Sequence, residues 1–452
     1  MNNNQKTLTK KNHILLIQRH IALIDELLSK QVNMILHHKR FQQLESSWRG
    51  LYYLVNQATG TDVQKLKIRI LDISWKALSK DLSRAIEFDQ SELFNKIYNR
   101  EFGHPGGEPF GILIGDYYIT HKLHKNVATQ DIRTLQSLSK VAAAAFAPFI
   151  TSVEPAIFGL DSFADLHSSL NLNNIFQQAE YFEWKQFRNN EDARFIGLVL
   201  PHTLMRLPHE QAEQTKKFCF QETVNALNDY LWGNAAYCFA AVTIRAFNQS
   251  GWLADIRGVE QDKISGGLVL DLPRHSFSTD KQDLICKYAT DVCITDKQEK
   301  ILSDLGFISL CECKYMELAA FYGCQSMQIS KSFEHTSAAN NAKLATMLQY
   351  MLCVSRFAHY IKVLVRDKVG SFINAEECER YLENWLMQYT AAGEDLTTDI
   401  KAKYPLREAR IQVQDRPEKP GCYLCFIHLR PHYQLDQLQS QLHLITELVI
   451  GK

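Results

Sequence analysis

The sequence predicts an α+β protein with an N-terminal helical arm, a mixed α/β region and a C-terminal region in the order α-α-β-β. Apolar residues near the N-terminus recur every three or four positions, as they do on one face of a helix. Strand-like and helical runs follow, separated by loops rich in glycine and proline. Two helical runs and then two alternating runs occupy the last part of the chain. Its 452 residues are enough for two or three domains.

The N-terminal helical pattern covers residues 13–58. Its apolar positions begin with Ile14, Ile17, Ile21 and Ile24 and continue at the same spacing. This pattern predicts one long amphipathic helix or a helix pair, whose apolar stripe must lie against the rest of the chain or against another subunit. The run Leu66–Leu71 then alternates apolar and basic residues, which predicts a half-exposed strand.

The middle of the chain alternates between the two patterns. Helices are expected at Ser91–Arg100, Gln130–Ala147, Tyr230–Phe247 and from Asp296 onwards. Strands are expected at Phe110–Ile119, Arg194–Leu200, Val292–Thr295 and Phe307–Cys311. Glycine and proline mark Gly103–Pro109 and Gly251–Lys281 as loops.

The C-terminal region begins near Ala338. Helices are expected at Ala338–Lys368 and Glu376–Tyr389, and strands at Ala409–Gln414 and Cys422–Leu429. The final segment, residues 435–449, fits both patterns. Its leucines have helical spacing, whereas Leu442-His-Leu444 alternates as a strand does, so both interpretations stay open.

Composition excludes several classes of protein. Lys+Arg and Asp+Glu are 50 each, and a net charge of zero argues against a nucleic-acid binder. Eleven cysteines at irregular spacing, with no secretory cleavage pattern, indicate reduced thiols and a cytoplasmic location. No stretch reaches the roughly 20 apolar residues that a membrane span needs, so no membrane insertion is expected.

Candidate catalytic and metal-binding motifs are weak. Cys422 and Cys425 lie in a predicted strand, where residues three apart point to opposite faces and cannot share a metal. Cys311 and Cys313 lack further ligands nearby, and Gly103–Gly107 lacks the Lys-Ser/Thr ending of a phosphate loop. We therefore expect no catalytic residue, no cofactor and no metal. An enzyme that uses Cys311/Cys313 or the glycine loop is the weaker alternative.

Arginines stand out inside otherwise apolar segments. Examples are Arg49, Arg245, Arg257, Arg356 and Arg366. A buried guanidinium needs partners and commonly finds a carboxylate. Each is expected to form a salt bridge within the chain or with a neighbouring subunit.

Six stretches, taken together and in order, resemble the TssC/VipB family, the large sheath subunit of bacterial type VI secretion systems. They are RFQQLESSWRGL (40–51), GGEPFGILIGDYY (106–118), AAAAFAPF (142–149), WLADIRGVE (252–260), SRFAHYIKVLVRDKVG (355–370) and LRPHYQL (429–435). The resemblance implies a two-domain tail-sheath-like subunit. Its expected parts are an N-terminal helical arm (1–45), an N-terminal sheath domain (46–335) and a C-terminal tail-sheath domain (336–452).

The resemblance also implies a structural function and a set of partners. Family members co-polymerise with a small sheath subunit into a helical tube around an inner tube protein. The tube is attached to a baseplate, contracts to expel the inner tube, and is recycled by a AAA+ unfoldase. The alternative within the family is a non-contractile or baseplate-associated scaffold.

The interlacing strands of the family's C-terminal domain carry over to two segments here. The expected interface residues are Ile411, Gln412, Val413, Leu424, Phe426 and His428. Strands donated between neighbours would supply main-chain hydrogen bonds that survive rotation of the domains. The arm before residue 40 is shorter than in many relatives and strongly helical, so the linkage between subunits is expected to differ there.

Overall fold

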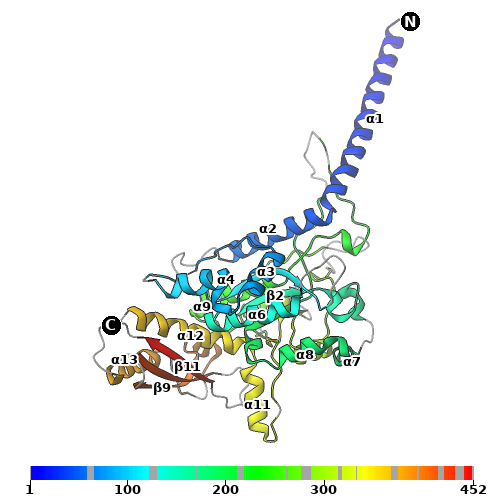
Figure 1. The fold of residues 1–452 in the computed structure, drawn as a ribbon. Coiled ribbons are helices and arrows are strands. Elements are labelled where there is room, and N and C mark those ends of the chain that lie inside the picture. The colour runs from blue at the N-terminus through cyan, green and yellow to red at the C-terminus, as the bar shows by residue number, and fades with distance from the viewer. Residues whose placement is uncertain are drawn as a thin grey trace. The chain divides into compact units, whose positions relative to one another are not determined.

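The computed structural model describes residues 2–58, 66–104, 106–121, 130–167, 171–210, 218, 220–260, 263–275, 287–313, 318–331, 333–367, 375–393, 396–415, 422–432 and 442–449. The chain forms two compact units (Figure 1). Unit 1 comprises Met1–Tyr52, His202–Gly233 and Asp271–Asp291. Unit 2 comprises Tyr53–Pro201, Asn234–Leu270 and Val292–Lys452.

Two long helices open the chain, the first in unit 1 and the second in unit 1 as far as Tyr52. They are α1 (Asn2–Leu36) and α2 (Lys39–Ala58), so the N-terminal pattern belongs to a helix pair (Figure 1). The helical hydrogen-bond pattern is interrupted at His38. Its amide donates to the carbonyl of Ile35, and its own carbonyl accepts the first hydrogen bonds of α2. Unit 1 also contains the short antiparallel pair of β4 (Thr203–Leu204) and β5 (Trp232–Gly233).

A six-stranded sheet forms the centre of unit 2. Its order is β1-β2-β3-β7-β8-β6. The strands are β1 (Leu113–Ile119), β2 (Phe149–Val153), β3 (Ile196–Leu200), β7 (Ile308–Glu312), β8 (Ala319–Phe321) and β6 (Leu268–Val269). The first four run parallel, and β8 runs antiparallel to both of its neighbours.

The central strands are buried along their whole length. Every residue of β2 and β3 is buried, which suits parallel strands covered on both faces. The polar members of β2 are satisfied inside the sheet, because the hydroxyl of Thr151 donates to the carbonyl of Tyr117 and that of Ser152 donates to the carbonyl of Val199. This strand was not predicted from the sequence.

Helices flank this sheet. They are α3 (Trp75–Arg84), α4 (Glu92–Phe94), α5 (Arg100–Phe102), α6 (Asp131–Ala145), α7 (Leu172–Gln177), α8 (Phe182–Arg188), α9 (Ala236–Ser250) and α10 (Asp296–Asp304). Local chemistry fixes several ends. Ser74 caps α3, and Thr295 and Gln298 form a capping box on α10. Gly251, with φ 78°, ends α9 in the left-handed region that glycine adopts without strain.

The C-terminal region confirms the predicted order of two helices and two strands and adds further elements. The helices are α11 (Thr336–Ala345), α12 (Leu348–Asp367), α13 (Ala375–Met387) and α14 (Thr398–Lys403). The strands β9 (Leu406–Asp415), β10 (Cys422–Pro431) and β11 (Leu442–Val449) form an antiparallel sheet in the order β11-β10-β9. Residues 442–449 are therefore a strand, and residues 435–441 lie outside the described part of the chain.

One apolar core joins α12 and α13 to this sheet. Buried side chains of both helices meet the inward residues of β9 and β10. The cluster includes Phe357, Ile361, Leu382, Ala409, Ile411, Val413, Cys425, Ile427 and Leu429. Burial of a fully enclosed aliphatic side chain contributes about 1.5–3 kcal/mol, so this cluster stabilises the packing of the two helices on the sheet.

Two predicted strands are wrong. Leu66–Leu71 has no regular structure and pairs with no strand in the described part of the chain: Lys67 and Arg69 form ion pairs with Glu108 and Glu101, while Ile70 is 69% exposed. Val292–Thr295 has buried side chains at Val292 and Ile294, but it belongs to no strand and leads directly into α10.

Several predicted helices have different bounds. The helix expected at Tyr230–Phe247 begins only at Ala236, because Trp232 and Gly233 lie in β5 and the side chain of Asn234 accepts from the Ala236 amide. The long run Ala338–Lys368 is divided into α11 and α12. The helix expected at Ser91–Arg100 contains a π-helical turn at Asn95–Asn99.

Candidate assembly surfaces

The six expected interface residues lie on two adjacent strands of the C-terminal sheet. Phe426 pairs with Gln412, and Ile427 pairs with Ile411. Side chains of β9 alternate between buried and exposed from Ala409 to Gln414, so Ile411 and Val413 are only 8% exposed while Gln412 is exposed. Leu424, Phe426 and His428 are partly exposed on the same outward face as Gln412. The set therefore divides into two buried and four outward-facing side chains.

Among the described residues, only β9 and β11 have an edge without a neighbouring strand in this sheet. β10 lies between β9 and β11, so its main chain is paired on both sides. One end of the outer edge of β9 is covered locally, since Leu406 exchanges hydrogen bonds with Tyr389 and Ala391. Near the other end, the amide of Val413 donates to Oε2 of Glu379 on α13 at 2.8 Å. Sequence reasoning missed this contact, which joins residues 34 positions apart.

The helix α12 has two chemically different faces. Its apolar face, with Phe357, Ile361 and Val365, belongs to the core of the C-terminal sheet. Four polar side chains at spacings of three or four residues contact the region before α12 or neighbouring rings. They are Arg356, His359, Lys362 and Arg366. This explains why charged residues interrupt an apolar helix here.

His359 and Lys362 are held without any carboxylate among the contacts that the structure gives them. Nε2 of His359 donates to the carbonyl of Ala145 at 2.9 Å, and burial lowers the pKa of His359 to about 3. Nζ of Lys362 lies 4.6 Å from the ring centroid of Phe146 and 5.2 Å from those of Tyr98 and Phe102. Burial also lowers the pKa of Lys362, to about 8.

The guanidinium of Arg366 forms hydrogen bonds with the glycine-rich loop. Its NH1 donates to the carbonyls of Glu101, His104 and Gly107 at 3.1–3.4 Å. The loop that superficially suggested a phosphate site is thus held through its carbonyl oxygens, which cannot bind an anion. A guanidinium suits this role because its donors spread in a rigid planar fork.

Some of the arginines in apolar segments have carboxylate partners within the chain, and others contact main-chain carbonyls or rings. Arg49 pairs with Glu45 at 2.8 Å on α2. Arg245 instead donates to the carbonyls of Leu268 and Gly266, and Arg356 stacks on the ring of Tyr360. Arg366 forms an ion pair with Asp367 at 3.1 Å, and for Arg245 and Arg356 a salt bridge to a neighbouring subunit stays a prediction.

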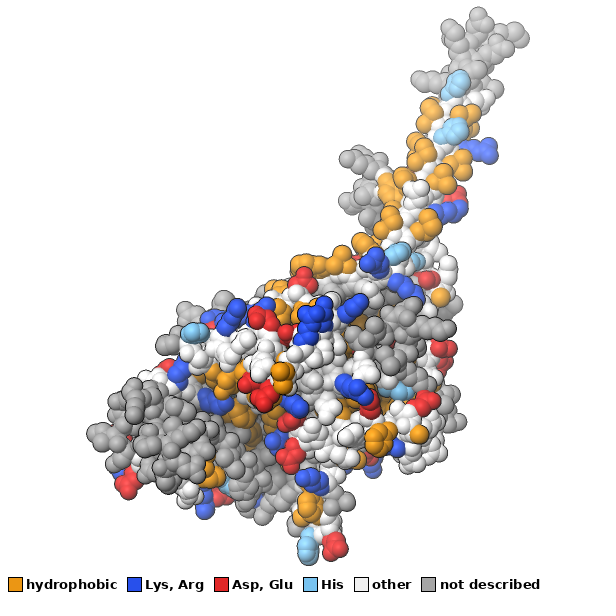
Figure 2. All heavy atoms as spheres, viewed as in Figure 1, with side chains coloured by type: hydrophobic (Ala, Val, Ile, Leu, Met, Phe, Trp, Pro, Cys, Tyr) orange, Lys and Arg blue, Asp and Glu red, His pale blue; other side chains and the backbone are white. Residues whose placement is uncertain are grey.

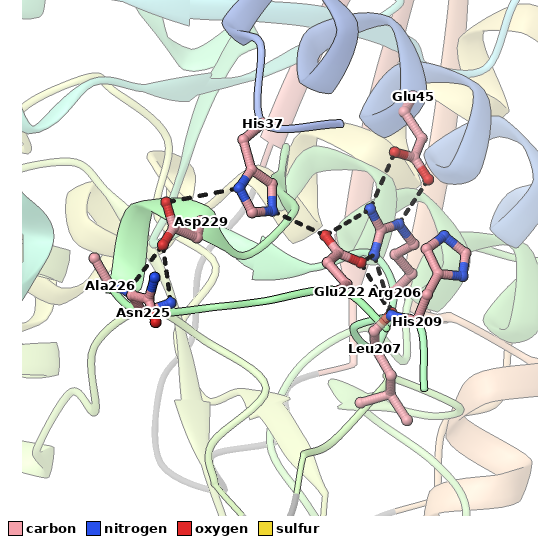
Figure 3. A network of polar contacts seen from close by, with 9 residues as sticks. All are labelled: His37, Glu45, Arg206, Leu207, His209, Glu222, Asn225, Ala226 and Asp229. Atoms are coloured by element: carbon pink, nitrogen blue, oxygen red, sulfur yellow. Dashed lines mark hydrogen bonds and ion pairs between the residues drawn. The ribbon is translucent and has the colours of Figure 1, made fainter. Parts of the chain in front are cut away.

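A polar network fixes the junction of α1 and α2 within unit 1 (Figure 3). The side chain of Arg206 is 8% exposed and donates to Glu45 on α2 at 2.7 Å and to Glu222 at 2.5 Å. Nε2 of His37 lies 3.1 Å from Glu222, and its Nδ1 lies 4.0 Å from Asp229. Burial would raise the pKa of Glu222, but hydrogen bonds from Arg206 and the His209 amide outweigh it, so this pKa is lowered. The network therefore carries fixed negative charge beside His37.

Both N-terminal helices expose apolar side chains, which Figure 2 shows along α1. On α1 these include Ile14, Ile17, Ile21, Ile24, Leu27 and Met34. On α2 they are Phe41, Leu44, Trp48, Tyr52 and Val55, with Trp48 64% exposed. Exposed apolar rows of this length are typical of interaction surfaces.

The thiols and carboxylates offer little reactive chemistry. Burial raises the pKa of Cys425 to about 12 and also raises that of Cys311, so both remain protonated thiols near neutral pH. Within the described residues, no group of three or more His, Cys, Asp or Glu side chains is arranged to hold a metal. The same part of the chain contains no helix with the length and apolarity that crossing a membrane requires.

Comparison with known families identifies the family to which the chain belongs. The VipB model described as "EvpB/VC_A0108, tail sheath N-terminal domain" matches residues 18–328, and "EvpB/VC_A0108, tail sheath gpW/gp25-like domain" matches residues 337–448. The chain belongs to the VipB tail sheath family. The expected TssC/VipB membership and the two-domain α+β fold class are thereby confirmed.

A curated relative agrees with this assignment. The type VI secretion system sheath protein TssC1 of Pseudomonas aeruginosa is 40% identical over 454 aligned residues, which cover 99% of this chain and 89% of the relative. A chain in the cryo-EM structure of the anti-feeding prophage baseplate matches with a TM-score of 0.37 and 7% identity, covering 82% of this chain and 81% of that one. A likeness this weak carries no conclusion about fold or function. The VipB family is structural and is not a known enzyme family.

Proposed function

We propose that this VipB-family chain co-polymerises with a small sheath subunit into a helical tube that surrounds an inner tube and contracts to expel it. The observation that carries the proposal is the match of both tail sheath domains, in order, across residues 18–328 and 337–448. An open helical filament needs only a head-to-tail contact that does not close on itself. Contraction then requires two packings of the same interfaces with different free energies.

The partners follow from this proposal. The sheath binds its own copies and a small sheath subunit, encloses an inner tube protein and starts from a baseplate. A AAA+ unfoldase disassembles it after contraction. The work of contraction comes from the lattice of subunits, so the large subunit needs no active site, in keeping with its protonated thiols.

The proposed contact is strand addition at β9, with the outward side chains of β9 and β10 beside it. Ile411 and Val413 contribute their main chain, since their side chains are buried in the core. Gln412, Leu424, Phe426 and His428 present side chains on the outward face. A partner strand would satisfy an edge that is an aggregation hazard in a solitary subunit.

Co-expression with the small sheath subunit from the same type VI cluster tests this function. Electron microscopy of the purified complex should show hollow tubules that contain both chains. Monodisperse globular particles that contain both chains would contradict it. Tubules that always have the same length per subunit, and never shorten to a second state under conditions that induce contraction, would instead support the non-contractile scaffold.

A further inference from the structure

The outer edge of β9 can be read from its contacts. In an antiparallel strand, alternate residues direct both N–H and C=O away from the paired neighbour. The amide of Val413 points outward, because it donates to Glu379 and not to β10. Ala409 and Ile411 have the same parity, and their side chains share the buried face with Val413. The outer edge therefore presents the main chain of Ala409, Ile411 and Val413.

The contact made by Glu379 is unusual for a carboxylate. Glu379 is partly buried on α13, between the buried Cys378 and the exposed Arg380. Among the described residues, no ion pair joins Glu379 to a basic side chain, and its hydrogen bond to the Val413 amide is 2.8 Å long. Its charge raises the pKa of the Cys378 and Cys425 thiols, after the larger effect of their burial. A carboxylate thus lies beside the strand edge in surroundings that do not neutralise it.

An inward-directed charge at a strand edge opposes pairing with another strand. An incoming strand would bring its own carbonyl oxygen to the Val413 amide, where the carboxylate oxygens already lie. Two acceptors cannot share one N–H without repulsion. Natural sheets use charged residues at edges in this way to prevent unwanted association.

We propose that Glu379 is a displaceable guard that keeps the β9 edge closed in the free subunit and gives way to the main chain of an incoming strand during assembly. This inference rests on the proposed strand addition at β9. When a partner carbonyl takes over the Val413 amide, the Glu379 side chain can turn to solvent and regain hydration. The β9 edge therefore pairs only with a partner strand that supplies its full set of main-chain hydrogen bonds. A brief encounter that offers a single hydrogen bond does not displace Glu379.

The full-length Glu379→Ala variant tests the guard. Without the carboxylate, we expect hydrogen exchange at the Val413 amide to accelerate at least tenfold in the free chain. We also expect a severalfold larger fraction of self-associated species by size-exclusion chromatography with light scattering. Glu376→Ala is the matched control, because it removes the same charge from an exposed position in the first turn of α13.

Two further variants keep the test decisive. Glu379→Gln retains an oxygen acceptor without the charge and should show an intermediate self-associated fraction, even if the alanine variant is poorly folded. Adding Ala409→Pro to Glu379→Ala removes an outward N–H and should return self-association to the wild-type level. Self-association that persists in this double variant would overturn the proposal, because it would not use the β9 edge.

The outcome is separable from that of the proposed function. Wild-type exchange and wild-type self-association in Glu379→Ala and Glu379→Gln would refute the guard, while tubules formed with the small subunit would still support the sheath. Faster exchange and more self-association support the guard in the free chain, whatever the outcome of co-expression.

Discussion

Single residues in this chain act mostly through main-chain partners. Arg366, Arg245 and His359 all donate to carbonyl oxygens, and Glu379 accepts from an amide. The sequence pattern singled out Arg245 and Arg366 as polar residues in apolar segments and predicted carboxylate partners for them. The carbonyl acceptors lie far along the chain, at Leu268 for Arg245 and at Ala145 for His359, and Arg366 also pairs with the carboxylate of Asp367 at 3.1 Å. Polar residues inside an apolar helix thus predict a buried contact without predicting its partner.

His359 makes the free energy of unfolding depend on pH in the acidic range. Burial lowers the pKa of His359 to about 3, so the native state keeps the ring neutral while the unfolded chain binds a proton below its ordinary value of 6.5. Stability therefore falls as pH decreases from 6.5 towards 3, by up to about 1.4 kcal/mol per pH unit from this group. Protonation would place a hydrogen on Nδ1, which has no hydrogen-bond partner among the described residues.

The comparison variant is His359→Gln, whose amide can still donate to the Ala145 carbonyl. Urea unfolding at several pH values should show the wild type losing stability relative to this variant as the pH falls below 6.5. A difference that stays constant from pH 7 to pH 4 would show that His359 takes up its proton without cost. Other groups that titrate in this range affect both proteins alike.

At the scale of elements, the strand β9 separates two functions along one segment. Its inward side chains complete the core with α12 and α13, while Arg410, Gln412 and Gln414 are exposed and the outer edge carries the contact with Glu379. The strand itself was predictable from the alternation of apolar residues at 409, 411 and 413. Its place at the edge was not, because strand order depends on pairings with β10 and β11 that alternation does not encode.

Charged substitutions on the two faces of the C-terminal sheet should have different effects. Ile411→Glu buries a carboxylate in the core and should lower the free energy of unfolding by about 3 kcal/mol or more. Phe426→Glu adds the same charge to the partly exposed face and should unfold at nearly the wild-type denaturant concentration, yet fail to form tubules with the small subunit.

Chemical denaturation and electron microscopy of both variants would check this expectation. Wild-type tubules from a well-folded Phe426→Glu chain would show that the outward face of β10 is not an assembly surface. Wild-type stability of Ile411→Glu would contradict the assignment of its side chain to the core.

For the whole molecule, the fold class was predictable and much of the detail was not. The helical N-terminus and the α-α-β-β tail have strong periodicity over long segments, which survives in the structure. Short segments led to wrong predictions. Leu66–Leu71 alternates, but it pairs with no strand in the described part of the chain. The wholly buried β2 was not predicted because it lacks alternation. The polar network around Arg206 joins α2 to residues far along the chain, so spacing in the sequence gives no sign of it.

The proposed assembly requires that the subunit complete its C-terminal sheet with a strand from a neighbour. Hydrogen exchange of the segment 406–415, compared between the free chain and tubules formed with the small sheath subunit, tests it most directly. The account predicts that the outward amides of Ala409, Ile411 and Val413 become at least a hundredfold more protected in tubules, while Gln412, already paired with β10, changes little. Equal exchange of the outward amides in the free and assembled states would contradict it.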